Sequence, residues 1–321
     1  MIVFRDPAEI PAGFGPSVVA IGKFDGVHSG HRAVIDRARV TATDAGARVV
    51  AVTFDRNPLS LLRPELCPEA LVSVDQKIAL LRDAGVDAVL VLRFDEALAA
   101  LAPETFAERI LVDALGAVCV MVGADFRFGR GGAGTPEFLV EFGRTHGFTA
   151  DIVGDVQGGG RRVSSTWVRE LLAAGQVEDA ARLLGRPHAV RAEVVHGLKR
   201  GRELGYPTAN LATDAEGFIP ADGVYAGWLV DEGTDAGGYA PATRYAAAIS
   251  IGTNPTFDDV PVRQVEAYVL DETGLDLYGH IVQVQFVARV RGMVAFEGID
   301  KLIAQMDADV TDVRAALRSG G

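Results

Sequence analysis

The chain has 321 residues, of which 49% are hydrophobic and 23% charged, a composition typical of a globular protein with a sizeable core and long enough for two domains. Its net charge of −12 argues against general nucleic-acid binding, because binding a phosphate backbone needs a basic face. The two cysteines, Cys67 and Cys119, lie far apart without metal spacing, and we find neither a signal peptide nor an apolar run of about 18 residues, so we expect a cytoplasmic protein without disulfides or a membrane span.

The first half of the chain alternates short apolar runs with segments of helical period. The runs cover residues 17–21, 49–54, 88–92, 117–122 and, more weakly, 149–153. The helical segments stop at glycines, which favour the left-handed conformation that ends a helix, namely Gly46, Gly85, Gly116 and Gly147. This pattern predicts a parallel sheet covered on both faces, with ligands bound beyond the carboxyl ends of its strands.

A glycine-rich turn follows the first apolar run and leads into a helical pattern. It reads Gly22-Lys23-Phe24-Asp25-Gly26-Val27-His28-Ser29-Gly30-His31. A strand, a glycine-rich turn and a helix start together form a setting in which backbone N–H groups bind phosphate. His28 and His31 are one helical turn apart, so both can face the mouth of the turn. The alternatives are a metal pair, which the lack of a third ligand nearby in the sequence disfavours, and two histidines without a role.

A second candidate phosphate site combines three hydroxyl residues with arginines. It reads Arg161-Arg162-Val163-Ser164-Ser165-Thr166-Trp167-Val168-Arg169. A single hydroxyl at a helix start usually caps the helix, but this set suits a triphosphate, since guanidinium groups match phosphate oxygens. We expect helices at residues 167–174 and 177–184. Gly185-Arg186-Pro187 then breaks the helical pattern, and we predict domains at residues 1–186 and 187–321.

The second half contains strand-like runs without helices between them. They cover residues 189–195, 223–230, 245–251, 265–270 and 281–290. Such a series predicts an antiparallel barrel. Apolar residues at helical spacing between Leu302 and Leu317 predict an amphipathic helix that packs on the barrel.

A glycine-punctuated basic segment, residues 196–210, lies near the start of this half. Read on its own, it is a solvated loop. Thr208 and Asn210, however, offer oxygens on the same side of an extended segment, which suits Mg²⁺ held together with ATP oxygens. Glu266 lies in a later strand run, where a lone glutamate usually faces solvent.

These strings, in this order, resemble the bifunctional prokaryotic riboflavin kinase/FAD synthetase family. The turn is similar to the G-x-F-D-G-x-H-x-G-H motif of the FAD synthetases, and residues 164–169 to their S-S-T-x-I/V-R motif. Residues 197–210 resemble the G-x-x-R-G-R-x-L-G-x-P-T-A-N motif of riboflavin kinases, and residues 265–271 their V-E-x-x-x-L-D string. The resemblance implies an α/β N-terminal nucleotidyltransferase domain of the HxGH type, with a Rossmann-like parallel sheet. It also implies a mainly-β C-terminal riboflavin kinase barrel with a C-terminal helix.

The implied activity has two steps: ATP phosphorylates riboflavin to FMN in the C-terminal domain, and the N-terminal domain then transfers AMP from ATP to FMN. Mg²⁺ is the implied cofactor, and ATP, riboflavin and FMN are the implied substrates. In the N-terminal domain, His28 and His31 are implied to act on the phosphates of ATP. The other implied ATP-binding residues there are Gly22, Phe24, Asp25, Gly26, Gly30, Ser164, Ser165, Thr166 and Arg169. The implied flavin-binding residues there are Asn57, Asp125, Phe126, Phe128 and Arg161.

In the barrel, Glu266 is implied to be the base that accepts the proton of the riboflavin 5′-hydroxyl, and Thr208 and Asn210 are implied to hold the metal. The implied ATP-binding residues there are Gly197, Gly201, Arg202, Gly205, Tyr206 and Pro207.

Two positions depart from the family pattern. Asn57 stands where the family often has histidine and cannot carry a proton, and Gly292-Met293 replaces a segment that usually contains glutamate. The alternatives are therefore a monofunctional FAD synthetase or flavokinase with one inactive half, or a flavin-binding sensor. A positioned base such as Glu266 argues against the sensor, because binding alone does not need one. We expect no nucleic-acid or membrane partner, and the sequence leaves a homo-oligomer open.

Overall fold

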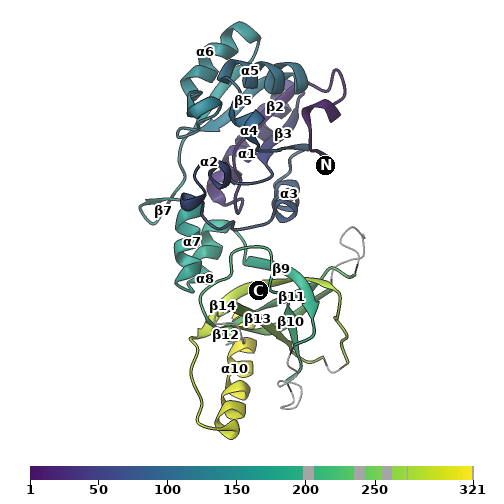
Figure 1. The fold of residues 1–321 in the computed structure, drawn as a ribbon, viewed down its shortest axis with the longest axis vertical. Coiled ribbons are helices and arrows are strands. Elements are labelled where there is room, and N and C mark those ends of the chain that lie inside the picture. Colours follow the sequence, from purple (N-terminus) through teal and green to yellow (C-terminus); the bar gives the residue numbers. More distant parts are fainter. Residues whose placement is uncertain (198–205, 235–242, 255–261, 273, 320–321) are drawn as a thin grey trace. The chain divides into compact units, whose positions relative to one another are not determined.

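The computed structural model describes residues 1–197, 206–234, 243–254, 262–272 and 274–319 (Figure 1). The chain forms two compact units, Met1–Ser165 and Thr166–Gly321. The first unit is an α/β fold built on a parallel sheet, and the second contains a closed antiparallel barrel. This confirms the predicted fold class.

Six strands of the first unit form one parallel sheet in the order β1-β4-β3-β2-β5-β6. Their bounds are β1 Ile2–Phe4, β2 Ser17–Ile21, β3 Arg48–Phe54, β4 Ala88–Leu92, β5 Ala117–Gly123 and β6 Thr149–Val153. From β2 the chain builds β3 and β4 on one side, and it then returns to place β5 on the other side of β2. The carboxyl end of β2 therefore lies at the switch point of the topology, where ligands of such sheets bind.

Helices cover both faces of this sheet, as the apolar runs predicted. The helices are α1 Ser29–Ala45, α2 Leu59–Leu62, α3 Val74–Asp83, α4 Glu96–Ala99, α5 Pro103–Phe106 and α6 Pro136–His146, together with the π-helix η3 Ala107–Ala114 and the 3₁₀ turns η1 Pro7–Glu9, η2 Pro64–Leu66 and η4 Arg130–Gly132. Val18 and Ala20 of β2 belong to the buried cluster that contains α1, whereas Val19 and Ile21 belong to the cluster that contains η3. Both faces of β2 are thus buried in the core.

The predicted helix ends are confirmed at α1 and α6. Gly46 and Gly147 follow these helices with φ angles of 61° and 80°, in the left-handed region that glycine adopts without a steric penalty. A two-stranded hairpin, β7 Gln157–Gly158 and β8 Arg161–Arg162, precedes the end of the unit.

The second unit begins with helices and continues into a six-stranded barrel of order β10-β13-β12-β11-β14-β9. The bounds are α7 Ser165–Ala173, α8 Val177–Leu184, β9 His188–Val195, β10 Thr208–Leu211, β11 Gly223–Asp231, β12 Thr243–Asn254, β13 Val262–Val269, β14 Ile281–Arg291 and α10 Ile299–Ser319. All strand pairs are antiparallel. In β14, Val282, Val284 and Phe286 are fully buried inside the barrel, which confirms the alternation read from the sequence.

The C-terminal helix α10 packs on the outer face of the barrel, as predicted. Val313 is fully buried there in a cluster with Ala226 and Leu270.

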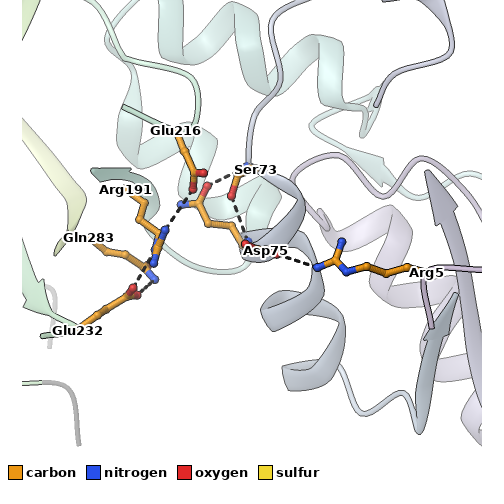
Figure 2. Close-up of polar contacts among 8 residues, drawn as sticks. Arg5, Ser73, Asp75, Arg191, Glu216, Glu232 and Gln283 are labelled. Carbon is orange, nitrogen blue, oxygen red and sulfur yellow. Dashed lines mark hydrogen bonds and ion pairs between the residues drawn. The ribbon is translucent and has the colours of Figure 1, made fainter. Parts of the chain in front are cut away.

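Elsewhere on the barrel, Arg191 of β9 lies between two carboxylates, with its Nε 2.8 Å from Glu232 and its Nη1 3.4 Å from Glu216 (Figure 2). Within the described residues, every helix is too short or too polar to cross a membrane.

Four short strands of the described chain are absent from the sequence prediction, namely the hairpin strands β7 and β8, and β1 and β10. β1 has three residues at the sheet edge, and β10 has four residues of which two, Thr208 and Asn210, are polar. β1 is too short to give a periodic signal, and β10 is both short and half polar. β10 carries Thr208 and Asn210, the two residues expected to hold the metal.

Two candidate active sites

The glycine-rich turn at the carboxyl end of β2 packs against the core through two of its own side chains. Phe24 and Val27 have positive φ angles, 49° and 41°, which non-glycine residues rarely adopt. Both side chains are buried, at 1% and 0% exposure, so packing stabilises a backbone shape that would otherwise be strained. Strained backbone of this kind is often found where a chain is shaped around a ligand.

The structure brings His28 and His31 together at the end of this turn. His28 is the N-cap of α1, and its Nδ1 accepts a hydrogen bond from the backbone N–H of His31 at 3.4 Å. Their rings stack with centroids 3.7 Å apart and planes 16° apart. A Cβ on Gly30 would lie 3.1 Å from the His28 ring, so glycine is the residue that leaves this ring room. The two imidazoles thus form one stacked pair at the N-terminus of a helix.

The surroundings of His31 favour its neutral form. Burial, followed by the charges of His28, Lys77 and Arg162, holds the pKa of His31 well below its usual value. Within the described part of the chain, His31 Nδ1 and the neighbouring Arg32 Nε are buried atoms without a hydrogen-bond partner. Buried polar atoms are normally satisfied, so two unsatisfied ones at a helix start indicate a place for a ligand oxygen or a water.

The hydroxyl-rich motif is attached to the same turn. Ser165 Oγ donates a hydrogen bond to the carbonyl oxygen of Asp25 at 2.8 Å, and the Asp25 carboxylate accepts one from the N–H of Leu71 at 2.9 Å. Ser164 is half-buried, whereas Arg161 is exposed on β8. Thr166 and Arg169 lie in the first turns of α7, which the second unit includes.

The candidate flavin residues fall into different surroundings. Asn57 lies just beyond the carboxyl end of β3 and accepts a hydrogen bond from the N–H of Leu59, the first residue of α2, at 3.1 Å. Asp125, beyond the carboxyl end of β5, is exposed and paired with Arg162 at 2.9 Å. Phe128 is a core residue at 6% exposure, and Phe126 is half-buried and stacked on it at 5.5 Å between ring centroids. Of the two rings, Phe126 is therefore the one with a face available to a ligand.

One residue near this site, Lys77, was missed by the sequence analysis. It lies on α3 with 7% of its surface exposed, and burial lowers the pKa of its amine. A lysine in a helix normally reads as a solvent-facing residue, so nothing in the sequence indicated this position.

The barrel assembles its own group of polar side chains. Asn210 of β10 lies directly opposite Glu266 of β13, and Glu266 lies directly opposite Ser250 of β12. Thr208 Oγ1 is 3.5 Å from Glu266 Oε2, and Asn210 Nδ2 donates to the carbonyl oxygen of Thr208 at 3.2 Å. The intervening residues of β10 and β13 are buried, so the polar ones share the outer face of the barrel.

Glu266 has surroundings suited to a base. Burial raises the pKa of its carboxyl group, and the hydrogen bond from Thr208 offsets part of that effect. A raised value brings the group closer to neutral pH, where a general base is most effective.

Gly197 packs directly against this group, since a Cβ there would lie only 2.4 Å from Asn210 Cγ. Tyr206, expected at the ATP site, donates from its hydroxyl to Asp307 of α10, and this contact raises its pKa to about 12. Pro207 is exposed just before β10. Gly201, Arg202 and Gly205, the other expected ATP-binding residues, lie outside the described residues.

The donor set of the barrel face fits a hard cation. Thr208, Asn210 and Glu266 all supply oxygen, which Mg²⁺ prefers, and Mg²⁺ commonly takes its remaining ligands from phosphate and water. Among the described residues there is no cluster of three or more histidine, cysteine or acidic side chains that could hold a metal alone. The geometry therefore fits a metal that arrives with a nucleotide.

Comparison with known proteins decides the family. The FAD synthetase family matches residues 11–167, and the riboflavin kinase family matches residues 184–317. The bifunctional riboflavin kinase/FMN adenylyltransferase of Pseudomonas fluorescens is 37% identical over 298 residues, covering 93% of this chain and 92% of that protein. The chain belongs to the bifunctional riboflavin kinase/FMN adenylyltransferase family.

A second relative with the same description and one solved structure are similar to this chain over nearly its whole length. The Escherichia coli K12 relative is 36% identical over 297 residues, covering 92% of this chain and 91% of the relative. A solved structure described as a macrolide-efflux protein from Streptococcus pneumoniae is 31% identical, covers 98% of both chains and has a TM-score of 0.85. The family recognised from the sequence motifs is thereby confirmed.

Proposed function

We propose that this chain makes FAD in two steps, phosphorylating riboflavin on the barrel and adenylylating FMN on the parallel sheet. The observation that supports both steps is that each unit brings together its own set of polar side chains. Asn210 and Glu266 lie opposite each other on the barrel, and His28 stacks on His31 at the end of β2. Family membership over both halves of the chain agrees with this division. We assign the adenylyltransferase to residues 1–186 and the kinase to residues 187–321.

In the kinase step, the riboflavin 5′-oxygen attacks the γ-phosphorus of ATP, and ADP leaves. Glu266 takes the proton of the attacking hydroxyl, and its half-buried position keeps the carboxylate weakly solvated. Thr208 and Asn210 would hold Mg²⁺, which when bound neutralises charge on the ATP phosphates. Gly197 lets the backbone approach Asn210 closely, and the remaining proposed ATP residues are Gly201, Arg202, Gly205, Tyr206 and Pro207.

In the second step, a phosphate oxygen of FMN attacks the α-phosphorus of ATP, and pyrophosphate leaves. His28 and His31 would bind the phosphates at the N-terminus of α1, where the helix dipole adds to the attraction. The leaving pyrophosphate would be bound by Ser164, Ser165, Thr166 and Arg169. Catalysis then consists of positioning and charge stabilisation, without a covalent intermediate.

The flavin of FMN would lie beyond the carboxyl ends of β3 and β5, near Asn57, Asp125, Phe126 and Arg161. Phe128 would support Phe126 from the core rather than touch the ligand. Because Asn57 cannot carry a proton, it would act there by hydrogen bonding. We place both reactions in the cytoplasm, where ATP is available.

One time course tests this proposal. The purified chain is mixed with riboflavin, ATP and Mg²⁺, and the flavins are separated at intervals. FMN followed by FAD is the expected result, and a parallel sample with EDTA in excess should form neither. FMN alone, or FAD only from added FMN, would indicate one inactive half, and bound flavin without turnover would indicate a sensor.

A further inference from the structure

The buried Lys77 lies in the first turn of α3, directly after a capping box that fixes the start of this helix. Ser73 caps α3 by accepting from the N–H of Gln76, whose side chain in turn accepts from the N–H of Ser73. Asp75 lies 3.5 Å from Arg5, a contact that Figure 2 shows beside Ser73. With this start fixed, the next residue, Lys77, faces the sheet and is almost fully buried.

The ammonium group of Lys77 binds two oxygens at the carboxyl end of β3. Its Nζ donates to the carbonyl oxygen of Phe54 at 2.9 Å and lies 3.5 Å from Thr53 Oγ1. Thr53 Oγ1 donates in turn to the carbonyl oxygen of Lys23 at 3.1 Å. Lys23 belongs to the glycine-rich turn, so Lys77 is connected through Thr53 to the backbone of the proposed phosphate site.

The charge of Lys77 also reaches the histidine pair. Together with His28 and Arg162, Lys77 lowers the pKa of His31, after the larger effect of burial. Asp25 of the turn and Asp55 beyond β3 act on Lys77 in the opposite direction and favour its charged form. Asp25 also accepts from Leu71 N at 2.9 Å, which fixes its carboxylate near this group of charges.

A buried ammonium group is costly, because burial removes its hydration. The structure retains this one beneath the turn that we propose to bind a polyphosphate. Its two hydrogen bonds go to neutral oxygens, and the carboxylates of Asp25 and Asp55 favour its charged form, so the buried group keeps its positive charge close to the turn. This accounts for a lysine at a position where a leucine would pack at lower cost.

We infer that Lys77 is a positioning residue for adenylyl transfer, which holds the phosphate-binding turn through Thr53 and keeps a buried positive charge at the carboxyl end of β3. The inference rests on the proposed function of the first unit. It predicts that Lys77 acts on ATP binding and on the protonation of His31 without touching the flavin.

Two variants separate these effects. Lys77→Met removes the charge and both hydrogen bonds, whereas Thr53→Val removes the link to Lys23 and keeps the charge. Lys301→Met is the matched control, because Lys301 is exposed on α10 and pairs with Glu297. FAD formation from FMN is measured against ATP concentration and against pH, and FMN formation from riboflavin is measured on the same preparations.

We expect Lys77→Met to raise the KM for ATP in FAD formation by about tenfold or more. It should also raise the pKa of His31, because a positive neighbour that opposes protonation of the ring is gone. The part of the pH profile that follows the protonation of His31 should therefore move to higher pH. Thr53→Val should raise this KM and leave the pH profile in place. Kinase activity should be unchanged in both variants, and Lys301→Met should match the unmodified chain throughout.

An unchanged KM and an unchanged pH profile in Lys77→Met would overturn the inference. If that variant does not give a cooperative thermal transition, Thr53→Val decides, and an unchanged KM there overturns the inference as well. Failure of the unmodified chain to make FAD from FMN is a different outcome, which contradicts the proposed function itself and the inference with it.

Discussion

Asn210 and Glu266 lie directly opposite each other on β10 and β13, although 55 residues separate them in the chain. The closure of the barrel produces this pairing, since β10 joins β13 on one side and β9 on the other. The amide and the carboxylate thus meet on one outer face, with the Thr208 hydroxyl 3.5 Å from Glu266 Oε2. The residues that we propose to hold the metal and the residue that we propose as the base are brought together by strand register rather than by a loop.

Glu266→Gln should abolish FMN formation, by at least about 100-fold, and leave FAD formation from supplied FMN intact. The amide cannot accept the proton of the riboflavin hydroxyl. Flavin products are measured from riboflavin and, separately, from FMN, and the exposed Glu272→Gln serves as the control. Loss of both activities in Glu266→Gln would contradict the assignment of separate sites.

The raised pKa of Glu266 also gives a prediction for stability. A carboxyl group whose pKa is higher in the folded state stabilises the fold at low pH, and this contribution is lost as the pH rises through the raised value. At pH 7, Glu266→Gln should therefore unfold at the same temperature as the unmodified chain or at a higher one. Kinase activity of the unmodified chain should fall on the acid side at a pH above that of an ordinary glutamate. A clearly lower unfolding temperature would show that the carboxylate stabilises the fold.

Gly197→Ala should impair the kinase and spare the adenylyltransferase. A Cβ at this position would lie 2.4 Å from Asn210 Cγ, so either Asn210 or the chain around Gly197 must move. Gly274→Ala is the matched control, because a Cβ there meets nothing within 4 Å. We expect at least about a tenfold loss of FMN formation in Gly197→Ala alone, measured at saturating riboflavin over a range of ATP and Mg²⁺. Equal behaviour of the two alanine variants would contradict the tight contact.

The sequence predicted those parts of the fold that depend on local pattern. The central strands of the sheet are buried on both faces, so β2 and β4 are continuous apolar runs with the predicted bounds. β10 gave no such signal, because its four residues are stabilised by pairing with β9 and β13 rather than by an apolar stripe of their own. Short polar strands of this kind depend on the tertiary fold.

The residues of the candidate sites also divide into those that a local pattern of the sequence predicts and those that it does not. The pairing of His28 with His31 follows from spacing at a helix start, and the structure confirms that the rings meet. Glu266 was found through the resemblance, since strand pattern alone reads it as a surface residue. Lys77 was missed because its burial arises from where α3 packs, which no local pattern of the sequence reports. The roles of these residues, and the boundary at residue 186, stay predictions.

Replacing His28 and His31 together by alanine should abolish FAD formation from FMN, by at least about 100-fold, and leave FMN formation unchanged. The stacked pair supplies the side chains that we propose to meet the ATP phosphates, and it belongs to the first unit, whereas the barrel belongs to the second. Loss of the His28 N-cap should also lower the unfolding free energy of the first unit by about 1 kcal/mol. His146→Ala, at the exposed end of α6, is the control. Retained FAD synthesis in the double variant would refute the assigned role.

His188 should make the stability of the barrel depend on pH in a way that does not involve catalysis. The ring is 1% exposed at the start of β9, and its Nε2 donates to the carbonyl oxygen of Phe218 at 2.7 Å. Burial lowers the pKa of His188 to about 4. In the unfolded chain the pKa of His188 has its ordinary value of about 6.5. Below that pH the unfolded chain therefore binds a proton at His188, whereas the folded barrel does not until the pH is much lower.

The stabilising contribution of neutral His188 is therefore complete above about pH 6.5 and is lost as the pH falls towards 4, on the order of 3 kcal/mol in all. Urea unfolding followed by tryptophan fluorescence reports this effect through Trp228 of β11, whereas Trp167, the other tryptophan of the chain, lies on α7 within the residues assigned to the adenylyltransferase. His188→Gln keeps a donor for Phe218 but does not titrate, so the fall in stability between pH 6.5 and 4 should be shallower by this amount. His146→Gln should retain the full fall. An unaltered pH dependence in His188→Gln would show that other groups cause the acid sensitivity of the barrel.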